Sequence, residues 1–396
     1  MTQIPPPLAH CRAPVIFSPS ELAVGDQCLL RCLLGSVRDV PTLGAHPAAE
    51  LGRVLHRLLE MAARGQVVRS GTSAEDAQRA LDALLDAADR RLETTWPNDP
   101  PRLRQILSPL AWRRKLRVIL DLAEKYLSNR LPRLPTYAAR MSLSLQDLPD
   151  GTWAEVTIEA PAMRLRGRAD LIQRTGRDLV IRDLKTGRVL TNEGDILPHV
   201  ERQLRLYGAM THSLWPTARV ALVVDDGVER QVGFSEVDES EVLAWLERVL
   251  ASLPQDTDIE TYTIATPGDA CRGCGHRHVC PAYRQQAPAF WRTENAVQMP
   301  LDVWGELVAI ESPDKQTANI TIVDAAGRTA KVFGLAAFRT AGIRQGDTVW
   351  LFGLHTQERC GRPGFWRHPY NFFEISNDGE PTRAWTLEMF TESSGS

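Results

Sequence analysis

The stretch 167–207 constrains this chain most, because it places charged side chains where a sheet would otherwise be apolar. It begins GRADLIQRTGRDLVIRDLKTG and ends, after a gap, in QLRLY. Two apolar runs separated by the turn residues Thr175-Gly176 predict a β-hairpin. Asp170 belongs to the first run, and Asp183 and Lys185 close the second. The sequence therefore predicts two carboxylates and an ammonium near one end of a sheet.

Side chains alternate between the two faces of a strand, so Asp183 and Lys185 lie on one face and Leu184 on the other. Buried like charges cost roughly several kcal/mol unless a cation or hydrogen bonds offset them. Mg²⁺ or Mn²⁺ prefers such oxygen ligands and binds one or two carboxylates together with phosphate. A lysine beside the ion can hold the attacking water and stabilise charge on the phosphate. The alternative is a surface D-x-K pair on an edge strand.

Two further segments carry polar residues in suggestive places. His56 lies within LGRVLHRLLE, whose apolar residues recur at helical spacing, although a lone histidine there is more often part of a core. Gln203 and Tyr207 are four residues apart, so they share one face of a predicted helix. There they are placed to meet a phosphate or the scissile bond.

Taken together, the order G-x-x-x-H-x-x-L-E, G-R-x-D, D-x-K-T-G and Q-x-x-x-Y resembles the RecB-like branch of the PD-(D/E)XK nucleases. The similarity spans about residues 18–285. It implies an α/β, restriction-endonuclease-like core with a mixed sheet and a helical insertion at about 60–135. It also implies roles for seven residues: His56, Asp170 and Asp183 as metal ligands with the Leu184 carbonyl, Lys185 as the catalytic lysine, and Gln203 and Tyr207 on the substrate side.

Seven cysteines in a chain expected to be intracellular favour metal or redox use over disulfides. The spacing Cys271-x2-Cys274-x5-Cys280 predicts three ligands of one centre that needs a fourth. From spacing alone, zinc and an iron-sulfur cluster are both open. In a zinc site, His276 or His278 can replace a thiolate.

One early cysteine followed by C-x2-C-x5-C resembles the iron-sulfur subgroup of the same nucleases, which includes AddB-type helicase-nuclease subunits and CRISPR-associated adaptation nucleases. The resemblance implies a [4Fe-4S] cluster held by Cys28, Cys271, Cys274 and Cys280. A second early cysteine, Cys32, departs from the usual pattern and leaves the fourth ligand open between the two. Because hydrolysis transfers no electrons, we expect a structural cluster.

Composition limits the broader class of protein. With 396 residues and 43% hydrophobic residues, the chain suffices for two or three domains. A net charge of -3 requires nucleic-acid binding to come from local basic patches. The N-terminus has no signal pattern and no apolar run approaches a membrane span, so we expect a soluble, cytoplasmic protein. Residues 1–17 are expected to form a loose Pro-rich tail.

Periodicity gives the expected elements of the nuclease region. Helices are expected at 18–34, 73–92, 102–128 and 239–253, strands at 140–146, 152–159, 163–173 and 178–185, and a hairpin at 220–224 and 229–234. The first part of the helix over 102–128 carries six basic residues: Arg102, Arg104, Arg113, Arg114, Lys115 and Arg117. They form either a solvated face or a wall that contacts substrate phosphates.

From about 296 to 380 the pattern changes to short alternating runs, followed by a tail at 381–396. Five expected strands, with a short helix at 335–340 between the third and fourth, follow the plan of an OB-like barrel. Such barrels bind single strands by stacking bases on aromatic residues beside basic ones. The candidates here are Phe365, Trp366, Arg367 and Tyr370.

The sequence thus predicts a Mg²⁺- or Mn²⁺-dependent deoxyribonuclease with an iron-sulfur cluster, acting on single-stranded DNA or DNA ends in repair, recombination or defence against mobile DNA. The family resemblance implies products with a 5′-phosphate and a 3′-hydroxyl. The chain has no G-x-x-x-x-G-K-[ST] segment. The alternative is a nuclease or DNA-binding subunit that acts only with a partner helicase or ATPase.

Overall fold

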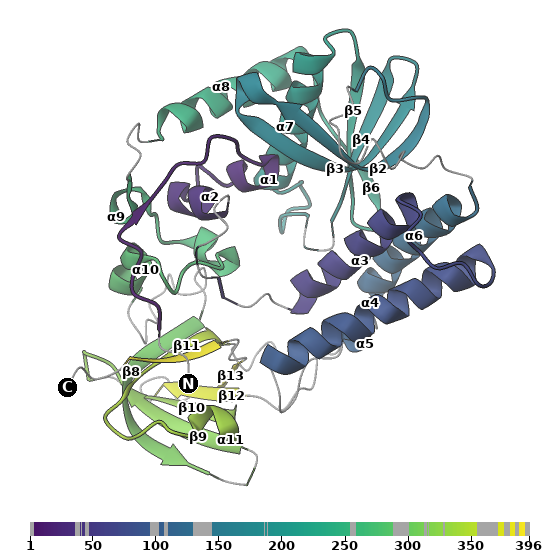
Figure 1. Ribbon diagram of the computed structural model, residues 1–396. Helices are drawn as coiled ribbons and strands as arrows, with labels where there is room; N and C mark the ends of the chain where they lie inside the picture. Colours follow the sequence, from purple (N-terminus) through teal and green to yellow (C-terminus); the bar gives the residue numbers. More distant parts are fainter. Residues whose placement is uncertain are drawn as a thin grey trace.

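The computed structural model describes residues 4–35, 40, 42–43, 47–95, 103–106, 110–129, 145–185, 187, 189–253, 259–287, 301–312, 315, 317–327, 329–354, 371–375, 381–384 and 388–392. A five-stranded sheet with its helices lies at one end of the molecule and a second sheet at the other (Figure 1). The two parts are joined by a segment rich in cysteine, residues 268–281, which we call the cysteine loop.

The central sheet has the order β2-β3-β4-β5-β6. Its strands are β2 (Gly151–Ala160), β3 (Leu165–Thr175), β4 (Asp178–Leu184), β5 (Arg219–Asp225) and β6 (Glu229–Val232). The pairs β2-β3, β3-β4 and β5-β6 are antiparallel, whereas β4 and β5 are parallel and need a crossover helix between them. The sheet is therefore mixed, as the sequence predicted.

One expected strand has no counterpart in the described residues. Residues 140–144 of the predicted strand 140–146 lie outside them, and Leu145 and Gln146 form part of a turn. That turn is fixed to β3, because the guanidinium of Arg174 donates to the Gln146 carbonyl at 2.7 Å. The described sheet begins at β2.

The two faces of the central sheet are covered by different helices. The crossover helix α7 (Pro198–Leu214) packs on one face, and α8 (Glu236–Ala251) packs on α7. The other face, through Ala154, Leu171 and Leu184, shares a core with four other helices. These are α3 (Pro47–Ala63), α4 (Ser73–Thr95), α5 (Leu103–Ile106) and α6 (Leu110–Leu127), which we call the helical layer (Figure 1).

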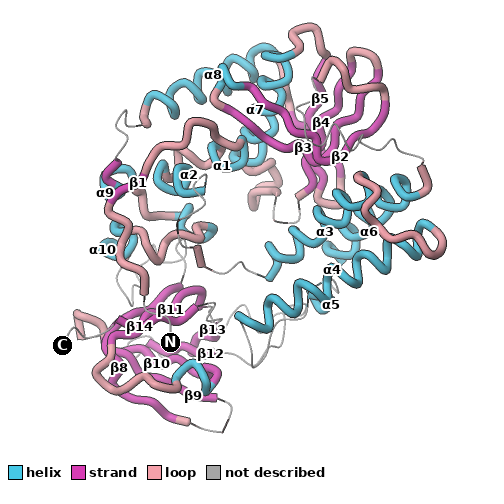
Figure 2. The backbone as a smooth tube through the Cα atoms, in the orientation of Figure 1, coloured by secondary structure: helices cyan, strands magenta, loops and turns pink. Residues whose placement is uncertain are grey.

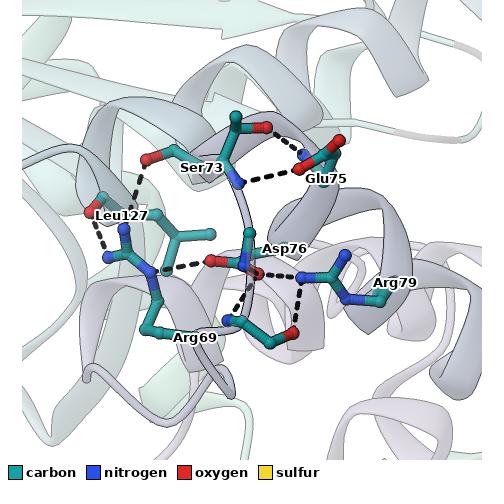
Figure 3. A network of polar contacts seen from close by, with 9 residues as sticks. Arg69, Ser73, Glu75, Asp76, Arg79 and Leu127 are labelled. Atoms are coloured by element: carbon teal, nitrogen blue, oxygen red, sulfur yellow. Dashed lines mark hydrogen bonds and ion pairs between the residues drawn. The ribbon is translucent and has the colours of Figure 1, made fainter.

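A buried aspartate holds the helical layer together. Asp76, in the first turn of α4, accepts hydrogen bonds from the amides of Ser70 and Gly71 at 3.0 and 3.1 Å (Figure 3). It also binds Arg79, and its bond from Arg69 Nε measures 2.8 Å. Arg69 in turn donates to the carbonyl of Leu127, the last residue of α6. The turn between α3 and α4 is thereby tied to the end of α6.

The N-terminal segment, expected to be a loose tail, is instead hydrogen-bonded to the rest of the protein at several positions. Strand β1 (His10–Cys11) pairs with β7 (Ile259–Glu260), and the amide of Leu8 donates to the Val279 carbonyl at 2.8 Å. The single helix expected over 18–34 is two helices, α1 (Pro19–Leu22) and α2 (Leu29–Gly35). Two short helices, α9 (Thr261–Ile264) and α10 (Pro281–Gln286), flank the cysteine loop.

The second sheet has the order β13-β12-β10-β9-β8-β11-β14 (Figure 2). Its elements are β8 (Leu301–Glu311), β9 (Thr317–Val323), β10 (Thr329–Ala336), α11 (Ala337–Thr340), β11 (Thr348–Leu354), β12 (Asn371–Ile375), β13 (Pro381–Ala384) and β14 (Glu388–Glu392). The strands expected at 303–310, 318–323, 329–333, 348–354 and 365–373 correspond to β8, β9, β10, β11 and β12 where the structure describes them. Two further strands, β13 and β14, follow. The short helix lies between the third and fourth strands, as expected.

A buried charged pair joins the cysteine loop to this second sheet. Arg277 Nε donates to Asp302 Oδ2 at 2.6 Å and Arg277 Nη2 to Oδ1 at 3.1 Å, while the Tyr283 hydroxyl donates to Oδ2 at 2.7 Å. Burial lowers the pKa of Arg277, but the facing Asp302 carboxylate outweighs this and raises it, so the guanidinium stays charged. Trp304 and Trp350 stack beside this network with ring centroids 4.8 Å apart.

No helix among the described residues is long and apolar enough to cross a membrane.

Removing one partner of this buried pair should loosen the junction. Asp302→Asn leaves the Arg277 guanidinium buried without a counter-charge, which we expect to cost roughly 3–5 kcal/mol. Thermal unfolding and limited proteolysis measure the change. The matched control is Glu311→Gln on β8, because the Glu311–Lys331 pair is solvent-exposed and its loss should cost less than about 1 kcal/mol. An equal loss of stability in the two variants would contradict the view that the Arg277–Asp302 pair stabilises this junction.

Candidate metal centre

Three side chains from different elements meet at one end of the central sheet. His56 comes from α3, Glu155 from β2 and Asp170 from β3, and one ligand atom of each lies within 4.8 Å of the others. His56 Nδ1 is 3.3 Å from Asp170 Oδ1 and 3.8 Å from Glu155 Oε1. One imidazole nitrogen and two carboxylates are a donor set suited to a divalent cation. Among the described residues, this is the only such cluster of acidic, histidine or cysteine ligands.

Glu155 did not appear among the residues predicted from the sequence. The β2-β3 register pairs Ala154 with Leu171 and Val156 with Ala169, so Glu155 stands opposite Asp170. Like charges in opposite positions destabilise a sheet. Glu155 also has a positive φ of 58°, a left-handed conformation that is costly for a non-glycine residue. Strained backbone and facing carboxylates persist where the surrounding structure enforces them, as at ligand-binding sites.

The predicted pair Asp183 and Lys185 lies next to this cluster, at the end of β4. Lys185 Nζ is 3.0 Å from Asp183 Oδ2. Gln203, on α7, bridges them, because its Nε2 donates to Asp183 Oδ1 at 2.9 Å and its Oε1 accepts from Lys185 Nζ at 2.8 Å. The glutamine amide therefore fixes the orientation of both charged groups.

Leu184 and Tyr207 position the backbone around these groups. The Leu184 amide donates to Asp170 Oδ2 at 2.6 Å, which ties β4 to the metal cluster, while the Leu184 side chain packs into the helical layer. The buried Tyr207 hydroxyl donates to the Arg168 carbonyl at 3.0 Å. Gly167 gives the ring room, since a Cβ there would approach Tyr207 Cε1 to 2.6 Å. Tyr207 thus supports β3 from behind.

The protonation states reflect this crowding of charge. Burial alone would lower the pKa of His56, but the hydrogen bond and charge of Asp170, together with the nearby Glu155 carboxylate, raise it to about 10. Burial, together with the charge of Asp170, raises the pKa of Asp183 against the opposing effect of Lys185. The cluster therefore attracts positive charge, which here is supplied by the imidazolium and the lysine.

Four cysteines line a second pocket, between α2 and the cysteine loop. The pocket is lined by Cys28, Cys271, Cys274 and Cys280, with His276 among the neighbouring residues. Cys32 is fully buried on α2 but does not line it. Burial raises the pKa of the thiols of Cys271 and Cys280, to about 12 and 11. His278 packs against Phe352 of the second sheet, with ring centroids 6.1 Å apart.

Comparison with known proteins identifies the family. Residues 16–281 match the family model of the PD-(D/E)XK nuclease superfamily. The chain belongs to this superfamily. PD-(D/E)XK nucleases use divalent metals, and the His56–Glu155–Asp170 group is where this member can hold one. A nuclease of this superfamily would bind DNA.

The other comparisons add little. A search of curated proteins returned no match. A solved structure described as "Crystal structure of SSO0001" aligns with 59% of this chain and 96% of its own, at 17% identity and a TM-score of 0.22. Both values are too low to carry an argument about fold or function.

The structure brings six of the seven predicted nuclease residues to one end of the sheet and places Tyr207 in the wall behind them. Glu155 was missed because its strand, TWAEVTIEA, contains two glutamates at ordinary strand positions. No local signal distinguishes Glu155 from Glu159. Phe365, Trp366, Arg367 and Tyr370 lie outside the described residues.

If Glu155 contributes to metal binding, its neutralisation should weaken the site. Glu155→Gln keeps the size of the side chain and an acceptor for Arg168, whose Nε lies 2.7 Å from Glu155 Oε2. We expect Mn²⁺ affinity to fall by about 10-fold or more, as measured by titration followed by electron paramagnetic resonance. Glu159→Gln on the same strand, where the glutamate pairs with exposed Arg166, should bind Mn²⁺ as the wild type does. Unchanged affinity of the Glu155 variant would remove the residue from the site.

Proposed function

We propose that this chain is a metal-dependent deoxyribonuclease that hydrolyses phosphodiester bonds in single-stranded DNA or at DNA ends. The observation that carries the proposal is the juxtaposition of the His56–Glu155–Asp170 group with the Asp183–Lys185–Gln203 network. A cation-binding cluster beside an oriented lysine is the combination that phosphodiester hydrolysis needs.

The donor set fits Mg²⁺ or Mn²⁺. Glu155 Oε1 is buried and has no hydrogen-bond partner, so it is available to a ligand. His56 and Asp170 would bind with it, and Asp183 and the Leu184 carbonyl are proposed to complete the set. When bound, the metal supplies Lewis-acid activation of water and stabilises the extra charge of the phosphate.

The protein residues then orient the reactants. Gln203 holds the Lys185 ammonium at the edge of the carboxylate cluster, where Nζ can donate to the attacking water or to a phosphate oxygen. Asp183 holds the Lys185 ammonium in place through the 3.0 Å ion pair. In-line attack on phosphorus, with the 3′ oxygen leaving, would give the 5′-phosphate and 3′-hydroxyl that the family resemblance implies.

For the cysteine pocket we propose a structural [4Fe-4S] cluster with Cys28, Cys271, Cys274 and Cys280 as ligands. Four thiolates on one zinc ion would approach one another to about 3.8 Å, given Zn–S bonds of about 2.3 Å. These sulfurs do not form a group within 4.8 Å of one another, although all four line the same pocket. The wider spacing favours a cluster, in which each thiolate binds a separate iron.

For the second sheet we propose an OB-like module that binds single-stranded DNA. Supporting this, its first five strands follow the order β12-β10-β9-β8-β11, with α11 between the third and fourth strands. Phe365, Trp366, Arg367 and Tyr370 remain the proposed base-stacking and phosphate-binding residues.

The proposal is tested by cleavage of end-labelled single-stranded and duplex DNA with Mg²⁺ or Mn²⁺, using anaerobically purified protein. Lys185→Ala and Asp183→Ala should lower the rate by at least about 100-fold, since each removes charge from the reacting centre. Their circular dichroism and iron content should match those of the wild type. A Lys185→Ala variant that cuts at the wild-type rate would refute the mechanism.

The products decide between modes of action. Release of single nucleotides indicates an exonuclease, and a ladder of fragments indicates an endonuclease. If the iron-loaded wild type cuts neither substrate, the chain is instead a subunit that requires a partner helicase or ATPase, or a DNA-binding protein. Cleavage restored by an added ATPase complex would identify a partner-dependent nuclease subunit, and its absence would favour a DNA-binding protein.

The cysteine site has its own test. Cys274→Ala should lower both iron content and the midpoint of thermal unfolding, because a structural metal centre contributes free energy of folding. Cys32→Ala is the matched control, since Cys32 lies on α2 outside the pocket. If the Cys274 variant kept wild-type iron content and stability, the proposed cluster ligation would be wrong.

A further inference from the structure

A second lysine lies beside the proposed catalytic centre. Lys115, in α6, lines a pocket together with His56, Leu184 and Lys185. Asp225 and Gly227, at the β5-β6 turn, complete its rim. The helical layer therefore contributes two polar residues to this pocket, His56 from α3 and Lys115 from α6.

Contacts with two turns fix the position of Lys115. Its Nζ donates to the Gly187 carbonyl at 3.2 Å, just beyond the end of β4. A Cβ built on Gly227 would lie 3.2 Å from the Lys115 backbone nitrogen and 2.9 Å from Arg114 Cβ, so α6 packs directly on the β5-β6 turn. Asp76 and Arg69 tie the C-terminal end of α6 to the turn between α3 and α4 (Figure 3). Both ends of the helix that carries Lys115 are therefore fixed by contacts.

The charges around the pocket favour an anion. Burial lowers the pKa of Lys115, and Asp226 opposes that effect. The nearby Asp225 carboxylate is engaged by Arg182, at 3.5 Å, and by the Gly227 amide, at 2.8 Å. Asp183 and Gln203 hold Lys185 on the opposite side. Two ammonium groups and an imidazole thus line one small pocket together with the Asp225 carboxylate, which already has its own partners. A phosphate group would offset the cost of placing the basic groups there.

We propose that Lys115 binds a backbone phosphate of the DNA strand adjacent to the scissile bond. This inference rests on the proposed nuclease function and adds a substrate-binding residue to it. Lys115 would act as a point charge that sets the position of the strand relative to Lys185, while the metal cluster and Lys185 perform the reaction. Of the basic residues predicted in this helix, Lys115 is the one that lines the pocket, whereas Arg113, Arg114 and Arg117 are exposed.

The test compares Lys115→Met with Arg117→Met, which removes an equal charge from the same helix two residues away. Binding of a fluorescent single-stranded oligonucleotide in EDTA, where no cleavage occurs, is measured from 50 to 200 mM salt. We expect Lys115→Met to weaken binding by about fivefold at low salt and to reduce the slope of log affinity against log salt by about 0.7. Arg117→Met should change neither quantity appreciably. Lys115→Arg should retain affinity.

Kinetic and stability measurements distinguish a wrong assignment of Lys115 from a wrong nuclease function. In cleavage assays Lys115→Met should raise KM more than it lowers kcat, and its thermal unfolding should resemble that of Arg117→Met. A purely structural role through Gly187 would lower stability without changing the salt slope. If the wild type binds and cuts DNA but the Lys115 and Arg117 variants behave alike, the assignment of Lys115 is wrong. If the wild type neither binds nor cuts, the proposed nuclease function fails with it.

Discussion

The concentration of acidic groups at one end of the central sheet is the constraint on which the nuclease domain depends. Glu155 on β2 lies opposite Asp170 on the adjacent strand β3, and Asp183 lies buried beside them. Uncompensated, such proximity of carboxylates would oppose folding. The helical layer supplies His56, the residue after β4 is Lys185, and α7 supplies the Gln203 amide that orients this lysine. Each neighbouring element therefore contributes a counter-charge or a hydrogen bond to the same place.

The helical layer is part of this proposed site and not a separate appendage. It packs on the sheet face opposite α7, with Leu184 in the shared core, so the residue that carries the proposed carbonyl ligand also anchors the layer. Asp76 locks the turn between α3 and α4 to the end of α6. That network ties together the two helices that carry His56 and Lys115, which lie beside the proposed reacting centre.

The cysteine loop joins the chain's distant parts. The N-terminal segment pairs with it through Leu8, Cys28 lines its pocket from the position just before α2, and the second sheet binds it through Asp302. A metal centre at this junction would stabilise all three connections at once. The stacked Trp304 and Trp350 cover the same junction with apolar surface. The position of the second sheet is thus coupled to the cysteine loop by a buried charge pair and not by a linker alone.

The sequence by itself determined the elements and residues whose signals are local. The hairpin with Asp170, Asp183 and Lys185 follows from alternation and a Thr-Gly turn, and the helix with Gln203 follows from four-residue spacing. The superfamily of the chain was likewise predicted from motif order. Glu155 and Lys115 were decided by tertiary structure, because no local pattern shows which glutamate faces another strand or which lysine of a basic helix meets a pocket. Such proximity arises from packing between distant elements, which the period of one segment does not encode.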